Sequence, residues 1–164
     1  MGILIAIEQQ KWEKARNETK IYFQKADIQE PVDSVFNRHQ PELKDPDRAG
    51  LLSTFLPGSG QFYAGRAGEG FTSFFFHISA LGWGTYNVIT GYFATALITG
   101  GGLFQSFYFG GIERAEHLAE SHNSKTTYQA NAELTSWLLS KLNGYLNQKR
   151  RSLSESPFHV DISE

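Results

Sequence analysis

The sequence has no cysteine, and its only methionine is Met1. The absence of cysteine excludes disulfide bonds, cysteine-ligated metal sites, thiol catalysis and cysteine-linked lipid anchors. A large excess of one charge is also missing, since 15 basic and 17 acidic residues give a net charge of -2. Because both signs are mixed in both end regions of the chain, nothing in the charge distribution indicates a nucleic-acid partner.

Charged residues are missing altogether from Gly70 to Ile112, although 20% of the whole chain is charged. Such a complete loss of charge is typical of a segment that is excluded from water. Thr90 and Gly91 divide this stretch into segments 70–90 and 92–112, each of about 20 residues, which is the length of a membrane-crossing helix. We therefore expect an all-α integral membrane protein built on a helical hairpin. Polar segments on both sides of the hairpin lower the mean hydropathy of the whole chain to -0.35.

The remaining segments flank or precede this hairpin. Residues 1–47 are expected to form an N-terminal amphipathic helix over 8–28 and then a proline-containing linker. Residues 49–64 carry no charge but contain a Pro57-Gly58 break, which favours a short half-inserted or re-entrant element. The other expected boundaries are a membrane module over 48–124 with a helical extension at 113–123, an amphipathic C-terminal helix over 125–148 and a disordered tail over 149–164.

A soluble core rich in glycine and aromatic residues, or a pair of β-strands around residues 86–99, is the alternative to the membrane hairpin. Threonine, tyrosine, valine and isoleucine in that region are good strand formers. Strict alternation of apolar and polar residues is missing, however, and little amphipathic material is present to cover so long an uncharged stretch. The pattern therefore favours the membrane interpretation.

The most specific string in the sequence runs from Leu56 to Gly65 and precedes the first expected span. Its glycines and aromatic residues suit a backbone that turns sharply and is approached closely by another helix. The residues expected to form this structural motif are Pro57, Gly58, Gly60, Gln61, Tyr63, Gly65 and Gly70.

This string is similar to the signature of the small two-span transmembrane-domain family, in which a glycine-rich turn and a Phe-Tyr pair introduce a membrane helix. It resembles more closely that family's bacterial envelope relatives, which have a Pro-Gly-x-Gly-Gln-x-Tyr core and a later helix with spaced alanines and an asparagine, here Ala115, Ala119 and Asn123. The resemblance covers roughly residues 48–123. It implies a membrane fold. It gives little information about activity, because the bacterial members have no established biochemical function. Gln61 stands where the better-known members carry a basic or histidine residue, and the spans lack their acidic residue.

Two further sets of residues lie within the expected spans. Gly102, Ser106 and Gly110 recur every four residues and form a small-residue ridge, which would let a neighbouring helix approach closely. His77, Asn87 and Gln105 are polar, and their exposure to lipid would be costly. These three residues are therefore a candidate intramembrane polar site.

No catalytic constellation is recognisable, because the sequence shows no nucleophile–base pair, paired catalytic carboxylates or phosphate-binding loop. Glu113, His117 and Glu120 share a helical face and could in principle hold a metal, but a solvated, charged helix end is the better interpretation. We therefore expect no enzymatic activity, no catalytic residue, no cofactor and no metal.

These observations favour a non-enzymatic integral membrane protein that acts as a scaffold or accessory subunit of a membrane or envelope assembly. One alternative is an oligomeric protein that handles small solutes or ions along a path lined by His77, Asn87 and Gln105. The other alternative is a peripheral lipid-binding protein. The expected partners are the lipid bilayer and other membrane subunits or further copies of the chain, without nucleic acid. A bacterial inner membrane is the expected location.

Overall fold

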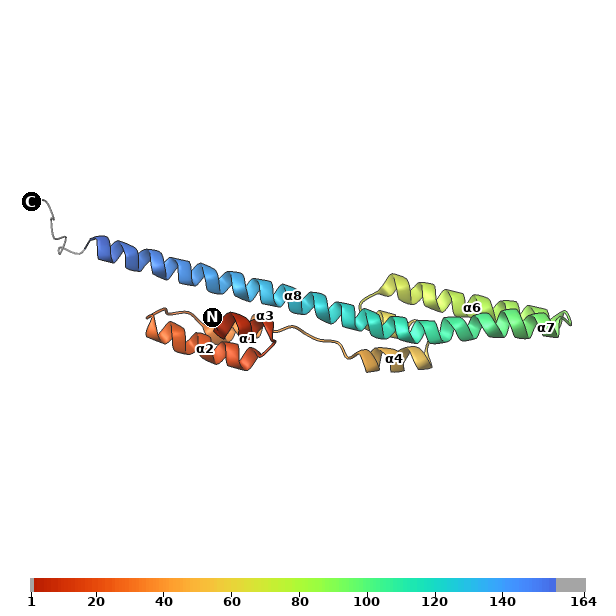
Figure 1. Cartoon of the computed structure of the whole chain (residues 1–164). Helices are drawn as coiled ribbons and strands as arrows, with labels where there is room; N and C mark the ends of the chain where they lie inside the picture. Colours follow the sequence, from red (N-terminus) through yellow and green to blue (C-terminus); the bar gives the residue numbers. More distant parts are fainter. Residues whose placement is uncertain (1, 156–164) are drawn as a thin grey trace, which may run out of the picture. The chain divides into compact units, whose positions relative to one another are not determined.

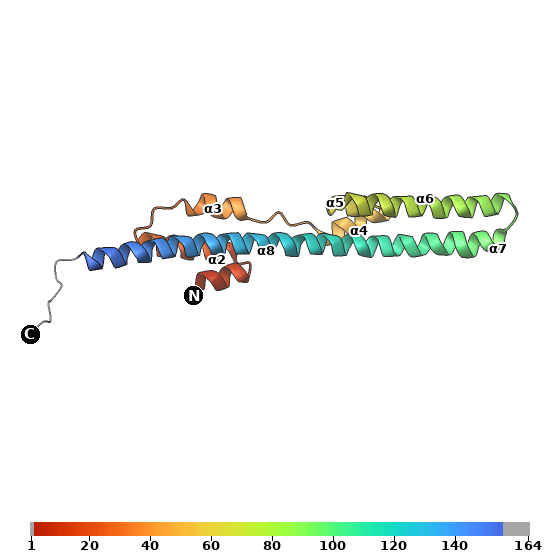
Figure 2. The same cartoon turned by 90° about the horizontal axis from the view of Figure 1, so that it is seen from above.

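Helices make up the secondary structure of residues 2–155, the part of the chain that the computed structural model describes. No β-strand occurs among these residues, so the all-α prediction is confirmed for them. The chain divides into two units (Figures 1 and 2). Unit 1 comprises the residues up to Pro41 together with those from Thr127 onward, and unit 2 comprises Glu42–Thr126.

Unit 1 is formed by three short helices and the C-terminal part of a long one. These helices are α1 (Gly2–Glu8), α2 (Trp12–Lys25), α3 (Val32–His39) and the part of α8 (Gly102–Ser154) that follows Thr126. Large apolar side chains from all four helices meet in one core, with Trp137 packed against its edge. The main members of this core are Ile7, Phe23, Phe36, Leu134 and Leu138.

The N-terminal segment, residues 1–47, differs from its predicted structure in two respects. The single helix expected over 8–28 is two helices, because Gln10 takes a left-handed conformation with φ of 58° and so ends α1. This turn brings Ile7 into the same core as Ala15 of α2. The expected linker at 29–47 contains α3, whose Val32 and Phe36 are buried in that core. Burial of these two side chains stabilises a helix that its local sequence predicts only weakly.

Helix α8 corrects the expected organisation of the C-terminal half. A break between the extension at 113–123 and a separate helix at 125–148 is absent, because α8 runs without interruption from Gly102 to Ser154. Asn123 does not end the helix, since its side chain bonds to the backbone of Lys44 instead of to its own helix. The first residues of the expected tail at 149–164 are also helical, and residues 156–164 lie outside the described part.

Unit 2 begins with two short helices that precede the hairpin. Helix α4 (Pro46–Phe55) is capped by Asp45, whose side chain accepts hydrogen bonds from the backbone N–H groups of Asp47 (3.0 Å) and Arg48 (3.3 Å). Pro46 occupies the first turn, where its missing N–H costs no hydrogen bond. The chain then breaks and starts α5 (Ser59–Tyr63), so the expected element at 49–64 is a pair of helices around a bend.

The uncharged stretch forms a hairpin of two antiparallel helical arms (Figures 1 and 2). The first arm is α6 (Ala67–Ile89), and the second arm consists of α7 (Phe93–Thr95), the π-helical turn η1 (Ala96–Gly101) and the start of α8. The turn between the arms falls at the predicted place, with Gly91 at φ of 84°. Between residues 2 and 155, no helix is both long enough and apolar enough to cross a membrane.

The two arms touch most closely where two glycines face each other. A Cβ atom placed on Gly100 would lie 2.6 Å from the Cα of Gly84, which no real side chain tolerates. Gly100 lies within η1, and π-helical turns commonly mark such local adjustments. The arms therefore pack backbone against backbone at this point.

Candidate functional site in unit 2

The motif residues meet at the bend between α4 and α5, beside the first turn of α6. Gly58 has φ of 96°, a left-handed conformation that favours glycine. A Cβ atom on Gly58 would also lie 2.4 Å from the carbonyl oxygen of Gly70, so α6 passes directly over the bend. Gly65 has φ of 80° and makes the turn that leads from α5 towards α6. Pro57 stands at the bend itself, before Gly58.

Gly60 lets α5 fit between α4 and α8. A Cβ atom on Gly60 would lie 2.0 Å from the carbonyl oxygen of Ala49 and 2.7 Å from the Cβ of Ala115. The small core around it consists of Ala49, Ala64, Ala115, Leu118 and Ala119, with Tyr63 packed against it. The alanines singled out in the later helix are thus core residues in unit 2, and both are fully buried.

Gln61 is the polar centre of this packing and is only 1% exposed. Its Nε2 donates to the carbonyl oxygen of Gly111 in α8 (2.9 Å), and its Oε1 accepts from the hydroxyl of Ser53 in α4 (3.2 Å). The Ser53 hydroxyl oxygen in turn accepts from the backbone N–H of Gly60 (3.1 Å). One buried amide therefore ties α4, α5 and α8 together, and it explains why the motif has a glutamine here.

Tyr63 and Asn123 fix the segment that leads into α4. The backbone of Lys44 forms two hydrogen bonds with the Asn123 side chain, both of 2.7 Å, one as donor and one as acceptor. Lys44 Nζ donates to the carbonyl oxygen of Tyr63 (2.6 Å), and the Tyr63 hydroxyl accepts from the N–H of Asp45 (3.1 Å). Sequence reasoning did not identify Lys44, because most of its part in this network comes from backbone atoms.

The predicted small-residue ridge lies on the outside of unit 2. Gly102, Ser106 and Gly110 are all exposed, and a Cβ atom on either glycine would meet nothing within 4 Å. Close packing between the two arms uses Gly84 and Gly100 instead. The spacing of four residues correctly places the three on one face, but it does not reveal whether another helix covers that face.

The three predicted polar residues do not converge within one chain. His77 (3% exposed) is packed among Phe104, Phe107 and Tyr108. Asn87 lies ten positions further along α6, about 15 Å away along the helix axis, and donates to the carbonyl oxygen of Trp83 (2.9 Å). Gln105 is exposed on α8. A single copy therefore does not assemble the three residues into one polar path.

One ion pair stands at the charged end of the hairpin. Arg114 Nε donates to Glu69 Oε2 at 2.7 Å, which joins α6 to α8 just outside the uncharged stretch. The hydrogen bond and the negative charge of Glu69 raise the pKa of the Arg114 guanidinium above its usual value. Arg114 is therefore charged at any physiological pH.

Unit 2 also contains a cavity of about 340 Å³ beside this ion pair, between α6 and α8. Its walls include Phe76 and Phe107, and His77 and Gln61 contribute to its lining. Small residues of both helices, Ser106 and Gly110 among them, keep it open. Two residues of the predicted ridge, Ser106 and Gly110, therefore line the same site as His77, the most deeply buried of the predicted polar residues.

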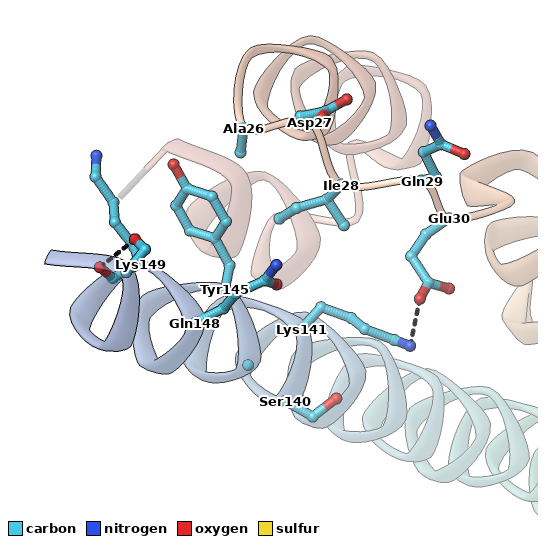
Figure 3. A pocket seen from close by; sticks show the side chains of 12 residues that line it. Ala26, Asp27, Ile28, Gln29, Glu30, Ser140, Lys141, Tyr145, Gln148 and Lys149 are labelled. Atoms are coloured by element: carbon cyan, nitrogen blue, oxygen red, sulfur yellow. Dashed lines mark hydrogen bonds and ion pairs between the residues drawn. The ribbon is translucent and has the colours of Figure 1, made fainter. Parts of the chain in front are cut away.

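A second cavity, of about 760 Å³, lies in unit 1 between the end of α2 and the last turns of α8 (Figure 3). Lys141 reaches across it to form an ion pair with Glu30. Tyr145 also lines it, with Lys149 Nζ 6.0 Å from the ring centroid. The charged lining residues are Asp27 and Glu30 on one side of this groove and Lys141 and Lys149 of α8 on the other, and such a mixture of signs is the ordinary composition of a solvated surface.

Among residues 2–155, no group of three or more acidic or histidine side chains is placed to hold a metal ion, and this includes Glu113, His117 and Glu120. Comparison of the chain with known protein families, with curated proteins and with solved structures finds no match. Any functional conclusion therefore rests on the site geometry and on the surface properties of the two units.

Proposed function

We propose that this protein is a non-enzymatic membrane protein that serves as a scaffold or accessory subunit, with the hairpin of unit 2 embedded in a lipid bilayer. The observation that carries the proposal is the outer surface of the hairpin, where large apolar side chains are exposed in the absence of any charge. We call these side chains the apolar belt. Its most exposed members, each at least 66% exposed, are Phe71, Phe75, Ile89, Tyr92, Phe93, Leu97 and Ile98.

The apolar belt is too continuous for an ordinary water-facing surface. Single exposed apolar residues are normal, but a contiguous apolar surface marks a site of contact with protein or membrane. The belt follows both arms and the turn, so it surrounds the end of the hairpin instead of forming a patch on one side. An apolar medium on all sides of the hairpin accounts for this distribution better than a single protein partner does.

The inward-facing residues explain why the hairpin helices are only moderately apolar as a whole. His77 and Asn87 are 3% and 5% exposed, and Gly84 and Gly100 face each other between the arms. These residues lower the mean apolarity of the two arms, although they contribute little to the outer surface of the hairpin. Helix α6 has 23 residues, which corresponds to about 34 Å and is comparable to a hydrocarbon core of about 30 Å.

The scaffold role follows from the contrast between this hairpin and the polar surface of unit 1. Unit 1 has its own apolar core, while lysine, glutamate and aspartate side chains are exposed on its helices. A folded polar unit on the same chain as an embedded hairpin is suited to present a binding surface at the membrane. Purification from membranes in mild detergent should recover a second protein or further copies of the chain. A strictly monomeric particle would contradict the scaffold role.

Insertion is tested by one substitution at two equally exposed leucines. Leu81 of the belt, near the middle of α6, is 50% exposed and Leu146 of α8 is 53% exposed. On water-facing surfaces Leu→Lys is nearly neutral, whereas a lysine in a bilayer centre costs about 2.5–3.5 kcal/mol. After alkaline carbonate extraction, we expect native protein and Leu146→Lys in the membrane pellet and a large fraction of Leu81→Lys in the supernatant. Equal behaviour of both variants, or release of the native protein, would reject the bilayer placement.

A further inference from the structure

Helix α8 carries a further apolar stripe in the part that belongs to unit 1. Its residues follow one another at alternating steps of four and three, which is the spacing of the contact face of a coiled coil. We call this set the α8 stripe, and its members are Tyr128, Ala132, Thr135, Leu139, Leu142, Leu146, Lys149 and Leu153. The stripe extends over about 38 Å of helix.

The other helices of unit 1 leave this stripe outside their core. Leu134 of α8 is 0% exposed and belongs to the core. At about 100° per residue, Leu146 lies about 120° further around the same helix. Leu139, Leu146 and Leu153 of the stripe are 45%, 53% and 70% exposed. The α8 stripe is therefore separate from the face that holds unit 1 together.

The opposite side of α8 has a different composition, although it is exposed as well. Its exposed residues are polar or small, namely Gln129, Glu133, Ser136, Ser140, Gly144, Asn147 and Arg151. The large exposed apolar residues of this part of the helix thus gather on one side. Single exposed apolar residues are normal, whereas a continuous line of them marks contact with a protein or a membrane.

The width of the stripe identifies the kind of partner. Its tyrosine and its four leucines lie within about 60° of the helix circumference. A helix that packs on a globular surface presents an apolar face of about 100° or more, whereas the narrower stripe is typical of helix pairing in a coiled coil. The partner is therefore a helix that has a narrow apolar stripe of its own.

A second copy of α8 supplies such a stripe, and the two fit when they run antiparallel. One antiparallel register overlaps the whole stripe. Its four contacts, each of which occurs twice by symmetry, are Tyr128–Leu153, Ala132–Lys149, Thr135–Leu146 and Leu139–Leu142. Leucines thus meet apolar or partly apolar side chains, and the lysine meets the smallest residue of the stripe.

The charge of the stripe decides between the two orientations. Lys149 is its only charged member, and Arg150 and Arg151 follow directly. In a parallel pair Lys149 would face itself, and like charges at close range repel each other. Antiparallel pairing moves the basic residues of the two copies to opposite ends of the contact. It also places the stem of Lys149 against Ala132 while its ammonium group reaches water.

We propose that the α8 stripe pairs antiparallel with the α8 stripe of a second copy of this chain. The proposal rests on the scaffold role proposed above, for which it names the partner, and it does not depend on the membrane placement. Pairing removes the exposed leucines from water, which is the main driving force for the association of such helices.

Lysine substitutions on the two sides of α8 test the contact. Leu139→Lys with Leu153→Lys places two charges in the stripe, and Ser136→Lys with Asn147→Lys places two on the opposite side. Native mass spectrometry of the full chain in mild detergent, over a dilution series, gives the dissociation constants. We expect native protein and the control to form dimers, and the stripe variant to dissociate at least about 100 times more readily. Hydrogen exchange of α1 and α2 shows whether unit 1 is folded in each variant.

Cross-linking of single cysteines tests the orientation, since the chain has no cysteine of its own. Ala132→Cys and Lys149→Cys are expressed together with different tags and oxidised. Antiparallel pairing predicts a disulfide between the two different variants and none between identical ones, because a disulfide needs Cβ atoms about 4 Å apart. Asn147→Cys lies on the opposite side of α8 and is the control, which should not cross-link with any of these variants.

Three outcomes would overturn the inference. These are dimers that persist in the folded stripe variant, disulfides between identical variants only, and a different protein in place of the second copy. In each of them the scaffold role would stand. A strictly monomeric native protein would reject the scaffold role together with the inference. Membrane placement is tested separately by the carbonate extraction.

Discussion

The interior of unit 1 is filled by large aliphatic and aromatic side chains, whereas that of unit 2 is filled mainly by alanine and glycine around one glutamine. The six largest fully buried side chains illustrate this contrast. Five of them, Ile7, Thr19, Phe36, Leu134 and Leu138, belong to unit 1, and the sixth, Gln61, belongs to unit 2. Apart from Leu118, which is in its core, unit 2 keeps most of its own large apolar side chains on the outside.

This difference agrees with the proposed membrane placement, in which the two units are stabilised in different surroundings. Burial of large side chains away from water is the main source of stability for a water-exposed fold, as in unit 1. Inside a bilayer the surroundings are as apolar as a leucine, so helices associate through close backbone contact and buried hydrogen bonds. Unit 2 has both features, in the Gly84–Gly100 contact and in the Gln61 network.

The largest effect should come from Leu134→Ala in the core of unit 1. Leu134 is 0% exposed, so its truncation leaves a cavity and should lower the free energy of unfolding by about 3–5 kcal/mol. Hydrogen exchange of α1 and α2 peptides in the full chain would report the loss. Leu146→Ala, at a residue that is 53% exposed, is the control and should have little effect. Equal effects would show that unit 1 does not depend on this core.

The opposite substitution should break unit 2. Gly60→Ala adds one methyl group 2.0 Å from the Ala49 carbonyl oxygen, where only backbone movement can make room. We expect a loss of about 3 kcal/mol, measured as increased hydrogen exchange in α4 and α5. Gly82→Ala is the matched change at a helical glycine with nothing within 4 Å of a Cβ atom, and it should be neutral or stabilising. Similar exchange in both variants would contradict the close packing.

Replacement of the buried glutamine should have an intermediate effect. Gln61→Leu keeps the size of the side chain but removes its hydrogen bonds to Gly111 and Ser53, which should cost about 2 kcal/mol. Thermal unfolding in detergent would measure this cost. Gln105→Leu removes an exposed amide of α8 and should not lower stability. If Gln61→Leu were as stable as native protein, the network would not hold unit 2 together.

The smallest effect should come from the exposed ion pair. Arg114→Gln removes the contact with Glu69, and since both side chains are partly solvated, we expect a loss of only about 0.2–1 kcal/mol that decreases in high salt. Because the pKa of Arg114 is raised, its contribution is fully present below the ordinary arginine value and disappears only as the pH rises through the raised one. A loss that persists in concentrated salt would indicate a packing role for Arg114 instead.

The sequence was most informative where a sharp turn of the backbone favours one residue type. The hairpin turn at Thr90-Gly91 and the sharp bend at Pro57-Gly58 were both predictable, because glycine readily adopts the left-handed conformations found at Gly91 and Gly58. The continuous course of α8 was not, because serine, histidine and asparagine around Asn123 are also typical of helix ends. Only the pairing of Asn123 with the Lys44 backbone shows why the helix continues.

The candidate site was predictable in its residues but not in their arrangement. Spacing identified Gly102, Ser106 and Gly110 as one face and His77 as a costly polar residue, but it did not bring His77 together with Ser106 and Gly110 in one cavity. Nor did it separate Gln61, whose amide nitrogen and oxygen both have partners, from His77, whose Nε2 has none in the described part of the chain. Both are polar residues in apolar surroundings, and their difference depends on neighbours that are distant in the chain.

The sequence by itself determined that the hairpin lacks charge, where it turns, and which residues share each helical face, because these properties depend on composition and on periods of three and four residues. The tertiary structure decided which face is covered. It buries Gly60, Gln61 and Gly100, and it leaves Gly102 and Leu97 outside. The reason is physical: a helix's own sequence fixes the direction of its side chains relative to one another, whereas burial depends on which other helix arrives to cover them.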